Sequence, residues 1–315
     1  MIGEAVIASL STMSDPQLMR LAVGLPASPS NSPRQMAWWD WRCEDASSRH
    51  VVVCAHGLSR QGRDFDALAR ALQPHSRVVA FDVAGRGQSD WLGDPMGYQL
   101  PTYVADAMLL LSELRRQQPD ARIDWVGTSM GGLIGMAVAA QPALAIGRLV
   151  LNDVGPIIQL EALQRIGSYL GGNPSFDSEQ QAIDYLATIS QGFGPHTPEQ
   201  WRALSLPMLR EREGRWFLHY DPALAQPVKA LLLSPNPEEA VRQGEAALWQ
   251  LFDAIRSPTL LLRGARSDLL SEATVAQMQG RGPRPVCVRF DGIGHAPTLV
   301  ADNQIAAVRD FLWAA

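Results

Sequence analysis

A serine with a glycine two residues away on either side is the strongest chemical signal in this chain of 315 residues. Ser129 is the centre of the sequence GTSMG, between a short apolar run, 123–126, and a longer run of small and aliphatic residues, 133–140. The two runs predict a strand followed by a helix. A serine at a sharp strand-to-helix turn exposes its hydroxyl, and the flanking glycines leave room for such a turn. The pattern therefore predicts that Ser129 is a nucleophile.

Six histidines are available to activate such a hydroxyl, and His295 is the best placed of them. A serine hydroxyl is a weak nucleophile near neutral pH, so it needs a neighbouring base. His295 follows a glycine-containing turn, after the strand-like run 286–290 and before the amphipathic run 302–313. A loop histidine at the end of a strand can reach into a site. We therefore predict that His295 takes the proton from Ser129.

An acid that orients the histidine is the third requirement. Asp268 lies in the turn after the apolar run 259–263, which predicts a strand. Open α/β sheets assemble their sites at the carboxyl ends of their strands. We therefore assign the role to Asp268, which would hold the imidazole tautomer without taking the proton itself. Asp153, after the predicted strand 148–152, is the alternative acid.

Two further patterns link the chain to a known family. The order Ser129, Asp268, His295 is the nucleophile–acid–base order of α/β-hydrolases. The segment DVAGRGQSD at 82–90 is similar to the D-x-x-G-x-G-x-S loop of lipase-, esterase- and epoxide-hydrolase-like members. The chain thus resembles the α/β-hydrolase superfamily over most of its length. Members with an aspartate nucleophile are disfavoured because Ser129 occupies the turn. The resemblance implies a serine hydrolase that uses no metal and no cofactor.

The resemblance also implies how negative charge would be stabilised during the reaction. In this fold one donor is the backbone N–H of the residue after the nucleophile, which is Met130 here. The other comes from the loop after the third strand, where we expect the N–H of Leu58. His56 and Gly57 precede Leu58 in that loop. We expect them to brace the loop, His56 by hydrogen bonding, rather than to act in the chemistry.

Arg60 lies just beyond this loop and is a candidate contact for the substrate. Its guanidinium would suit an anionic group on the substrate. Pairing with Asp64 or Asp66, four and six residues further along, is the alternative.

Apolar strand-like runs and helical runs alternate along most of the chain. Such alternation implies an α/β fold with a mostly parallel central sheet and helices on both faces. We expect strands at 35–43, 51–55, 77–81, 122–126, 147–152, 259–263 and 285–290, and helices at 64–73, 98–117, 131–140, 239–255, 272–279 and 302–313.

An interruption of this alternation predicts a separate cap. Residues 155–237 are too many for a plain loop and contain helical stretches at 161–170, 178–191 and 198–213. In related hydrolases an insertion at this point forms a mobile helical cap that supplies one wall of the pocket. We therefore divide the chain into a hydrolase core, 21–154 and 238–315, a cap, 155–237, and a poorly placed N-terminal extension, 1–20.

Composition excludes several other classes of protein. The net charge is −5, so the composition does not indicate a protein that binds nucleic acid. No run of about 18 apolar residues suggests a membrane span, and the N-terminus has no basic region typical of a secretory signal. The three cysteines, Cys43, Cys54 and Cys287, follow no zinc or redox spacing and favour a reducing cytoplasm. Nothing in the sequence indicates the oligomeric state.

The most direct function for these residues is hydrolysis of a small carboxylic ester through an acyl-enzyme. A C–C bond hydrolase of ring-cleavage products uses the same triad and a similar cap, although Leu58-Ser59-Arg60 replaces the glycine-rich loop usual there. A lactonase, perhydrolase or acyltransferase would use the same side chains. A small-molecule receptor could use the same fold without turnover. Fold analogy does not choose among these chemistries.

Overall fold

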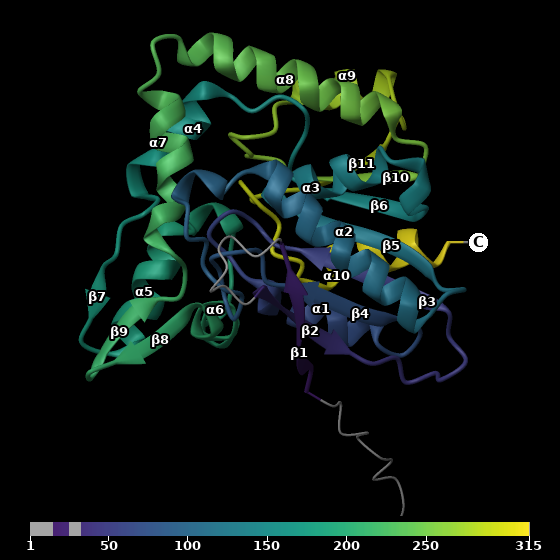
Figure 1. The fold of residues 1–315 in the computed structure, drawn as a ribbon, viewed down its shortest axis with the longest axis horizontal. Coiled ribbons are helices and arrows are strands. Elements are labelled where there is room, and N and C mark those ends of the chain that lie inside the picture. The colour runs from purple at the N-terminus through teal and green to yellow at the C-terminus, as the bar shows by residue number, and fades with distance from the viewer. Residues whose placement is uncertain (1–14, 25–32, 315) are drawn as a thin grey trace, which may run out of the picture.

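A mostly parallel sheet forms the centre of the computed structural model, which describes residues 15–24 and 33–314 (Figure 1). Within these residues eight strands form one sheet in the order β1-β2-β4-β3-β5-β6-β10-β11. The pairs β1–β2 and β2–β4 are antiparallel, and all later pairs are parallel. The strands are β1 Gln17–Val23, β2 Arg34–Trp41, β3 His50–Ala55, β4 Arg77–Phe81, β5 Arg122–Thr128, β6 Ile146–Asn152, β10 Thr259–Gly264 and β11 Val286–Phe290. The α/β-hydrolase fold expected from the sequence is therefore present.

Helices cover both faces of this sheet, as the alternating pattern predicts. Side chains of α2, α3, α8 and α9 pack into one apolar cluster, and those of α1 and α10 pack into the other. The inner strands are buried on both faces, which explains why they read as unbroken apolar runs. The helices are α1 Asp66–Leu72, α2 Leu100–Gln117, α3 Met130–Ala139, α8 Pro237–Ala254, α9 Glu272–Gly280 and α10 Asp302–Trp313.

The first strand corrects the predicted N-terminal boundary. β1 begins at Gln17 and pairs along its length with β2, so residues 17–20 belong to the sheet rather than to an extension. β1 lies at the edge of the sheet and most of its side chains are at least partly exposed. Because an edge strand needs no continuous apolar run, residues 17–23 carry no clear strand pattern. The rest of the predicted extension, residues 1–14, lies outside the described residues.

The chain between β6 and α8 forms a separate group of helices with its own small sheet, on the left in Figure 1. Its strands are ordered β7-β9-β8. We call this group the cap. Its elements are α4 Leu160–Tyr169, β7 Ser175–Phe176, α5 Glu179–Ile189, α6 Pro198–Ser205, β8 Leu209–Arg212, β9 Arg215–Leu218 and α7 Ala225–Leu232. The small sheet was not expected. The predicted helix 198–213 ends at Ser205 because Pro207, which lacks a backbone N–H, follows in a 3₁₀ turn, and 209–212 are a strand.

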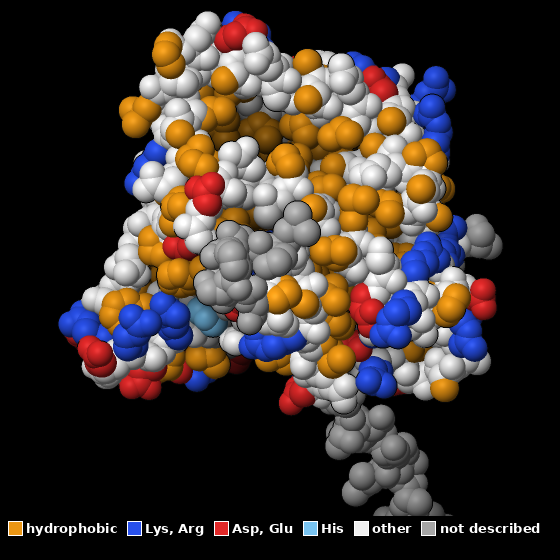
Figure 2. Space-filling view, viewed as in Figure 1, with side chains coloured by type: hydrophobic (Ala, Val, Ile, Leu, Met, Phe, Trp, Pro, Cys, Tyr) orange, Lys and Arg blue, Asp and Glu red, His pale blue; other side chains and the backbone are white. Residues whose placement is uncertain are grey.

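Helix α8 leads from the cap back to the core. Its Trp249 and Phe252 are buried in the same apolar cluster as α3. On the face drawn in Figure 2, hydrophobic side chains gather in a hollow just below this helix. Within the described part of the chain, no helix is both long and apolar enough to cross a bilayer.

Candidate active site

Ser129 lies at a strained turn between β5 and α3. Its backbone has φ 52° and ψ −117°, a conformation that residues other than glycine rarely adopt. A methyl group added at Gly127 would overlap the backbone of Gly131, and one at Gly131 would overlap the backbone of Ala55. Only glycine at both positions allows β5, the turn and α3 to approach so closely. The turn predicted from the GTSMG sequence is therefore present, with Ser129 at its apex.

His295 contacts Ser129 directly. Its Nε2 lies 2.9 Å from Ser129 Oγ, which is hydrogen-bonding distance. His295 comes from the loop between β11 and α10, 166 residues further along the chain. The sequence-based pairing of these two side chains is thus reproduced by the geometry.

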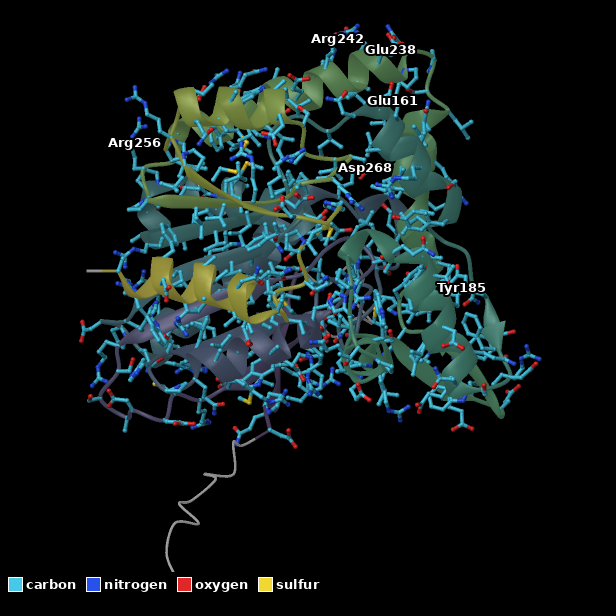
Figure 3. All side chains as sticks on the ribbon, turned by 180° about the vertical axis from the view of Figure 1, so that it is seen from behind. Glu161, Tyr185, Glu238, Arg242, Arg256 and Asp268 are labelled. Carbon is cyan, nitrogen blue, oxygen red and sulfur yellow. The ribbon has the colours of Figure 1, made fainter. Side chains whose placement is uncertain are left out.

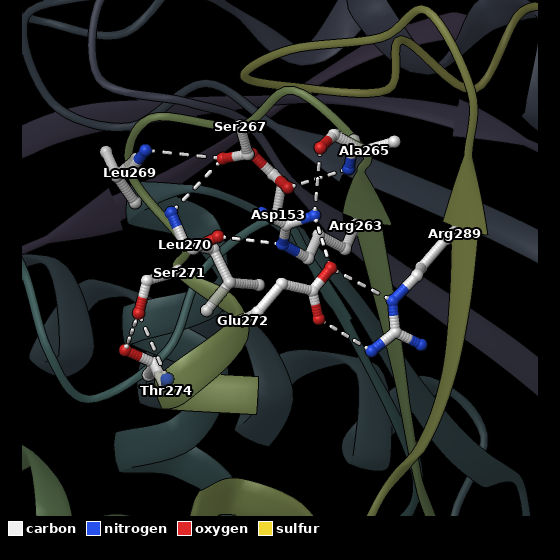
Figure 4. Close-up of polar contacts among 11 residues, drawn as sticks. Asp153, Arg263, Ala265, Ser267, Leu269, Leu270, Ser271, Glu272, Thr274 and Arg289 are labelled. Atoms are coloured by element: carbon white, nitrogen blue, oxygen red, sulfur yellow. Dashed lines mark hydrogen bonds and ion pairs between the residues drawn. The ribbon is translucent and has the colours of Figure 1, made fainter. Parts of the chain in front are cut away.

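The carboxylate on the far side of His295 belongs to Asp153. His295 Nδ1 lies 2.7 Å from Asp153 Oδ2. Asp153 is fully buried at the end of β6, and its Oδ1 accepts a hydrogen bond from the backbone N–H of Gly264 at 2.9 Å. Ser267 Oγ donates to Oδ2 at 2.6 Å (Figure 4). These donors fix the orientation of the carboxylate. Nδ1 then carries the imidazole proton, and Nε2 is left to accept one from Ser129.

Asp268 does not reach the histidine, and its expected pairing with His295 is wrong. Its side chain is 54% exposed, and its Oδ2 lies 2.8 Å from Nε of Arg165 in the cap. The conformation of the loop after β10, rather than the distance of that strand, gives the reason. In the loop after β10 it is the hydroxyl of Ser267 that turns towards the site, while Asp268 turns outward to the junction of core and cap (Figure 3).

The loop after β3 lies against Ser129. A methyl group on Gly57 would be 3.7 Å from Ser129 Cβ, and Leu58 lines the same cavity as the serine. Met130 is the first residue of α3, where a backbone N–H has no partner within the helix. The guanidinium of Arg86 is buried and donates from Nε to the carbonyl oxygen of Leu58 at 2.8 Å. The sequence singled out the loop that contains Arg86 but not this contact.

His56 holds the loop rather than facing the serine. Its Nε2 accepts a hydrogen bond from the N–H of Val83 at 2.9 Å, so its Nδ1 carries the proton and donates to the carbonyl of Gly57 at 2.7 Å. Burial lowers the pKa of His56 to about 3, because the charged form would be desolvated there. His56 is therefore neutral at ordinary pH and ties β3 to the end of β4.

Arg60 takes the alternative partner rather than an open position. Its Nε and Nη2 donate to the two carboxylate oxygens of Asp64 at 2.7 and 2.6 Å. Nη2 also donates to the carbonyl of Leu204 in the cap at 2.8 Å. The guanidinium lies over the ring of Phe193, with 5.6 Å to its centroid. Arg60 thus joins core and cap, and its charge is already neutralised by Asp64.

A cavity of about 410 Å³ opens above Ser129 and His295 between core and cap. This volume is in the range usual for sites that bind small molecules. The core side is formed by residues of the loops after β3, β5, β10 and β11. The cap side is largely apolar and consists of Ile166, Tyr169, Leu170, Leu186, Ile189, Phe193 and Met208, together with Arg165, Ser190 and Gly192. An insertion forming one wall of the pocket is what the sequence led us to expect.

Comparison with known families agrees with this geometry. A model of the alpha/beta hydrolase family matches residues 52–310. The chain belongs to this family. It is accordingly a hydrolase of the α/β-hydrolase superfamily, as its turn, loops and sheet suggested. Among described residues, no group of three or more histidine, cysteine or acidic side chains is arranged to hold a metal ion.

Individual α/β hydrolases resemble the chain over most of its length. A 3-hydroxybutyrate-oligomer hydrolase of Cupriavidus necator is 47% identical over 281 residues, 88% of this chain and 92% of that protein. An esterase of Mycobacterium tuberculosis is 28% identical, covering 73% of this chain and 71% of its own. The crystal structure of an alpha/beta hydrolase from Novosphingobium aromaticivorans superposes with a TM-score of 0.78 at 34% identity, covering 95% of this chain and 99% of that one.

Two residues that position this α/β-hydrolase site escaped the sequence interpretation. Ser267 donates to the acid, as described above. Asn152, buried at the end of β6, donates to Thr128 Oγ1 at 2.9 Å and to the carbonyl of Pro297 at 2.7 Å. It links the serine turn to the histidine loop. Both lie at carboxyl ends of strands, which is the only sequence signal that would have found them.

Proposed function

We propose that the chain hydrolyses ester bonds in short oligomers of 3-hydroxy acids, with oligomers of 3-hydroxybutyrate as the principal class. The observation that carries the proposal is the hydrogen-bonded series Ser129–His295–Asp153 at the base of a cavity. A serine aligned with a histidine and a buried carboxylate is the machinery of acyl transfer. The relative from Cupriavidus necator, whose name specifies such oligomers, supports the choice of substrate.

The first half of the proposed reaction forms an acyl-enzyme. Ser129 Oγ attacks the ester carbonyl while its proton passes to His295 Nε2. Asp153 stabilises the resulting imidazolium and remains ionised. The N–H groups of Leu58 and Met130 are the proposed donors to the oxyanion, a contribution worth about 10²–10³ in rate per donor in comparable sites. The C–O bond to the alcohol then breaks, and His295 gives its proton to the departing alkoxide oxygen.

The second half releases the acid. A water molecule gives its proton to His295 and attacks the acyl carbon, and the ester bond to Ser129 breaks. The proton returns to Ser129 Oγ, and the carboxylic acid leaves. All steps use this chain's own side chains and backbone amides, together with one water molecule from the solvent.

The cavity walls support a substrate that is largely aliphatic. Leu58 on the core side and Ile166, Leu170, Leu186 and Ile189 on the cap side offer methyl groups but few hydrogen-bond donors. A 3-hydroxybutyrate unit has one methyl branch and one ester, so most of its surface is suited to such walls. The ester carbonyl would then lie at the base of the cavity, beside Ser129 and His295.

The test is product analysis with a linear 3-hydroxybutyrate trimer. We expect the intact protein to convert the trimer to dimer and monomer, and Ser129→Ala to leave it unchanged. Chromatography separates and quantifies the products. Methyl butyrate, a lactone and a vinylogous diketone are compared at the same concentration. Turnover of the diketone or lactone, with none of the trimer, would replace the proposal by C–C hydrolysis or lactone hydrolysis. Equal turnover by Ser129→Ala would remove the serine route altogether.

A further inference from the structure

The cavity has a positively charged rim that the proposed chemistry does not use. Arg165 from α4 and Arg266 from the loop after β10 both line it, as does Asp268. Asp268 is paired with Arg165 across the junction of core and cap. Among the described residues, no hydrogen-bond or ion-pair partner contacts the side chain of Arg266. The guanidinium of Arg266 is therefore available to bind a ligand.

The side chains at this rim include one positive charge more than they have negative charges. Arg165 and Arg266 contribute two positive charges and Asp268 one negative charge, which leaves a net charge of +1. Arg60 adds nothing to this sum, because Asp64 holds both its Nε and its Nη2. One carboxylate from a bound molecule would neutralise the rim. The half-exposed pair of Arg165 and Asp268 is also weak enough in water for a second carboxylate to share Arg165.

We propose that Arg266, with Arg165, binds the terminal carboxylate of the substrate and selects esters whose alcohol part is a hydroxy acid. This inference rests on the proposed ester hydrolysis at Ser129. A guanidinium suits the task because its planar donors match a carboxylate in two parallel hydrogen bonds. The apolar walls described above would hold the chain between the two arginines and the serine.

The position of the carboxylate fixes the direction of cleavage. In an oligomer of hydroxy acids, the fragment with the free carboxylate is joined to the rest through its hydroxyl oxygen. When Ser129 attacks, that C–O bond breaks, the oxygen receives the proton from His295, and a free hydroxy acid leaves. The acyl group left on Ser129 comes from the hydroxyl end of the oligomer. The enzyme therefore shortens oligomers from their carboxylate end, and the carboxylate assists acylation rather than deacylation.

The experiment compares two substrates that differ in one charge: the 3-hydroxybutyrate dimer as the free acid and as its methyl ester. Arg266→Gln is measured beside Arg256→Gln, which removes the same charge far from the cavity, at the opposite end of the core (Figure 3). p-Nitrophenyl butyrate, which has no carboxylate, reports whether each variant is folded. We expect Arg266→Gln to raise KM for the acid about tenfold with little change in kcat. Values for the methyl ester and p-nitrophenyl butyrate should stay within about twofold, and Arg256→Gln should match the wild type on all three.

Each other outcome has a defined meaning. Equal kcat/KM of the wild type on acid and methyl ester, or an equal loss on both in Arg266→Gln, overturns the carboxylate site but leaves ester hydrolysis standing. Turnover of p-nitrophenyl butyrate with none of either dimer overturns the proposed substrate and this inference with it. A second measurement is independent of dimer turnover. 3-Hydroxybutyrate should inhibit p-nitrophenyl butyrate hydrolysis competitively, with an inhibition constant about tenfold higher in Arg266→Gln; an unchanged constant contradicts the assignment.

Discussion

The two walls of the cavity are built in opposite ways. On the core side, hydrogen bonds hold the polar groups in place, as those from Gly264 and Ser267 hold the buried Asp153. On the cap side, the lining is mostly aliphatic, and several of its side chains are exposed, such as Ile189 at 46% and Tyr169 at 37%. A buried hydrogen-bonded network tolerates little displacement, whereas apolar walls can change shape at low cost. We infer that the core wall determines the reaction and the cap wall, with the rim, determines the substrate.

Loss of the nucleophile should have the largest effect. Removing the Oγ of Ser129 with Ser129→Ala should lower kcat for p-nitrophenyl butyrate by about 10⁴–10⁶, because the residual rate depends on the oxyanion donors and binding alone. The absorbance of the released nitrophenolate measures the rate of both proteins. A residual rate near that of the wild type would mean that another group attacks the ester.

The next largest effect is expected from loss of the carboxylate that contacts His295, and two variants compare the candidates. Asp153→Asn should lower kcat by about 10³–10⁴, because an amide cannot hold His295 in the required tautomer. Asp268→Asn should keep kcat for the same uncharged ester within about tenfold, since its carboxylate contacts Arg165 rather than the histidine. Steady-state kinetics of both variants decide the matter. A larger loss in Asp268→Asn would restore the acid first expected from the sequence.

A smaller effect is expected from the cap wall. Ile189→Trp fills part of the cavity, so kcat/KM for p-nitrophenyl hexanoate should fall about tenfold relative to p-nitrophenyl acetate. Leu233→Trp is the matched control, since Leu233 is 85% exposed and does not line the cavity. Rates for a series of acyl lengths measure the change. An equal fall for acetate and hexanoate would place the damage in the reaction site, and an unchanged ratio would remove the cap from substrate selection.

The smallest effect concerns His56 and appears in stability rather than in rate. Its pKa is about 3 in the folded protein against 6.5 as the ordinary value, so between these limits the unfolded chain binds a proton that the folded chain does not. The free energy of unfolding therefore rises with pH across this window, and this contribution is fully present only above pH 6.5. In His56→Gln, about one proton fewer should be taken up on unfolding between pH 4 and 6. Urea unfolding at several pH values measures the slope; equal slopes in both proteins contradict a buried neutral His56.

The sequence predicted the fold and the contact between Ser129 and His295 because those signals are local. The glycines around Ser129 and the buried parallel strands follow from short-range sterics and burial. The acid was misassigned because the sequence does not show which side chain of the loop after β10 turns inward: Ser267 contacts Asp153, whereas Asp268 pairs with Arg165 of the cap. The partners of Arg60 and the pairing of Arg165 with Asp268 depend in the same way on how the cap packs on the core.

The most direct test of the whole account is the reaction of the protein with a fluorophosphonate, followed by intact-mass and peptide mass spectrometry. This reagent needs an activated serine but no particular substrate pocket. We expect one adduct per chain, on the peptide that contains Ser129, formed about 10²-fold or more slowly in Asp153→Asn and at a nearly unchanged rate in Asp268→Asn. An adduct on another residue, or a rate that depends on Asp268 and not on Asp153, would contradict the account.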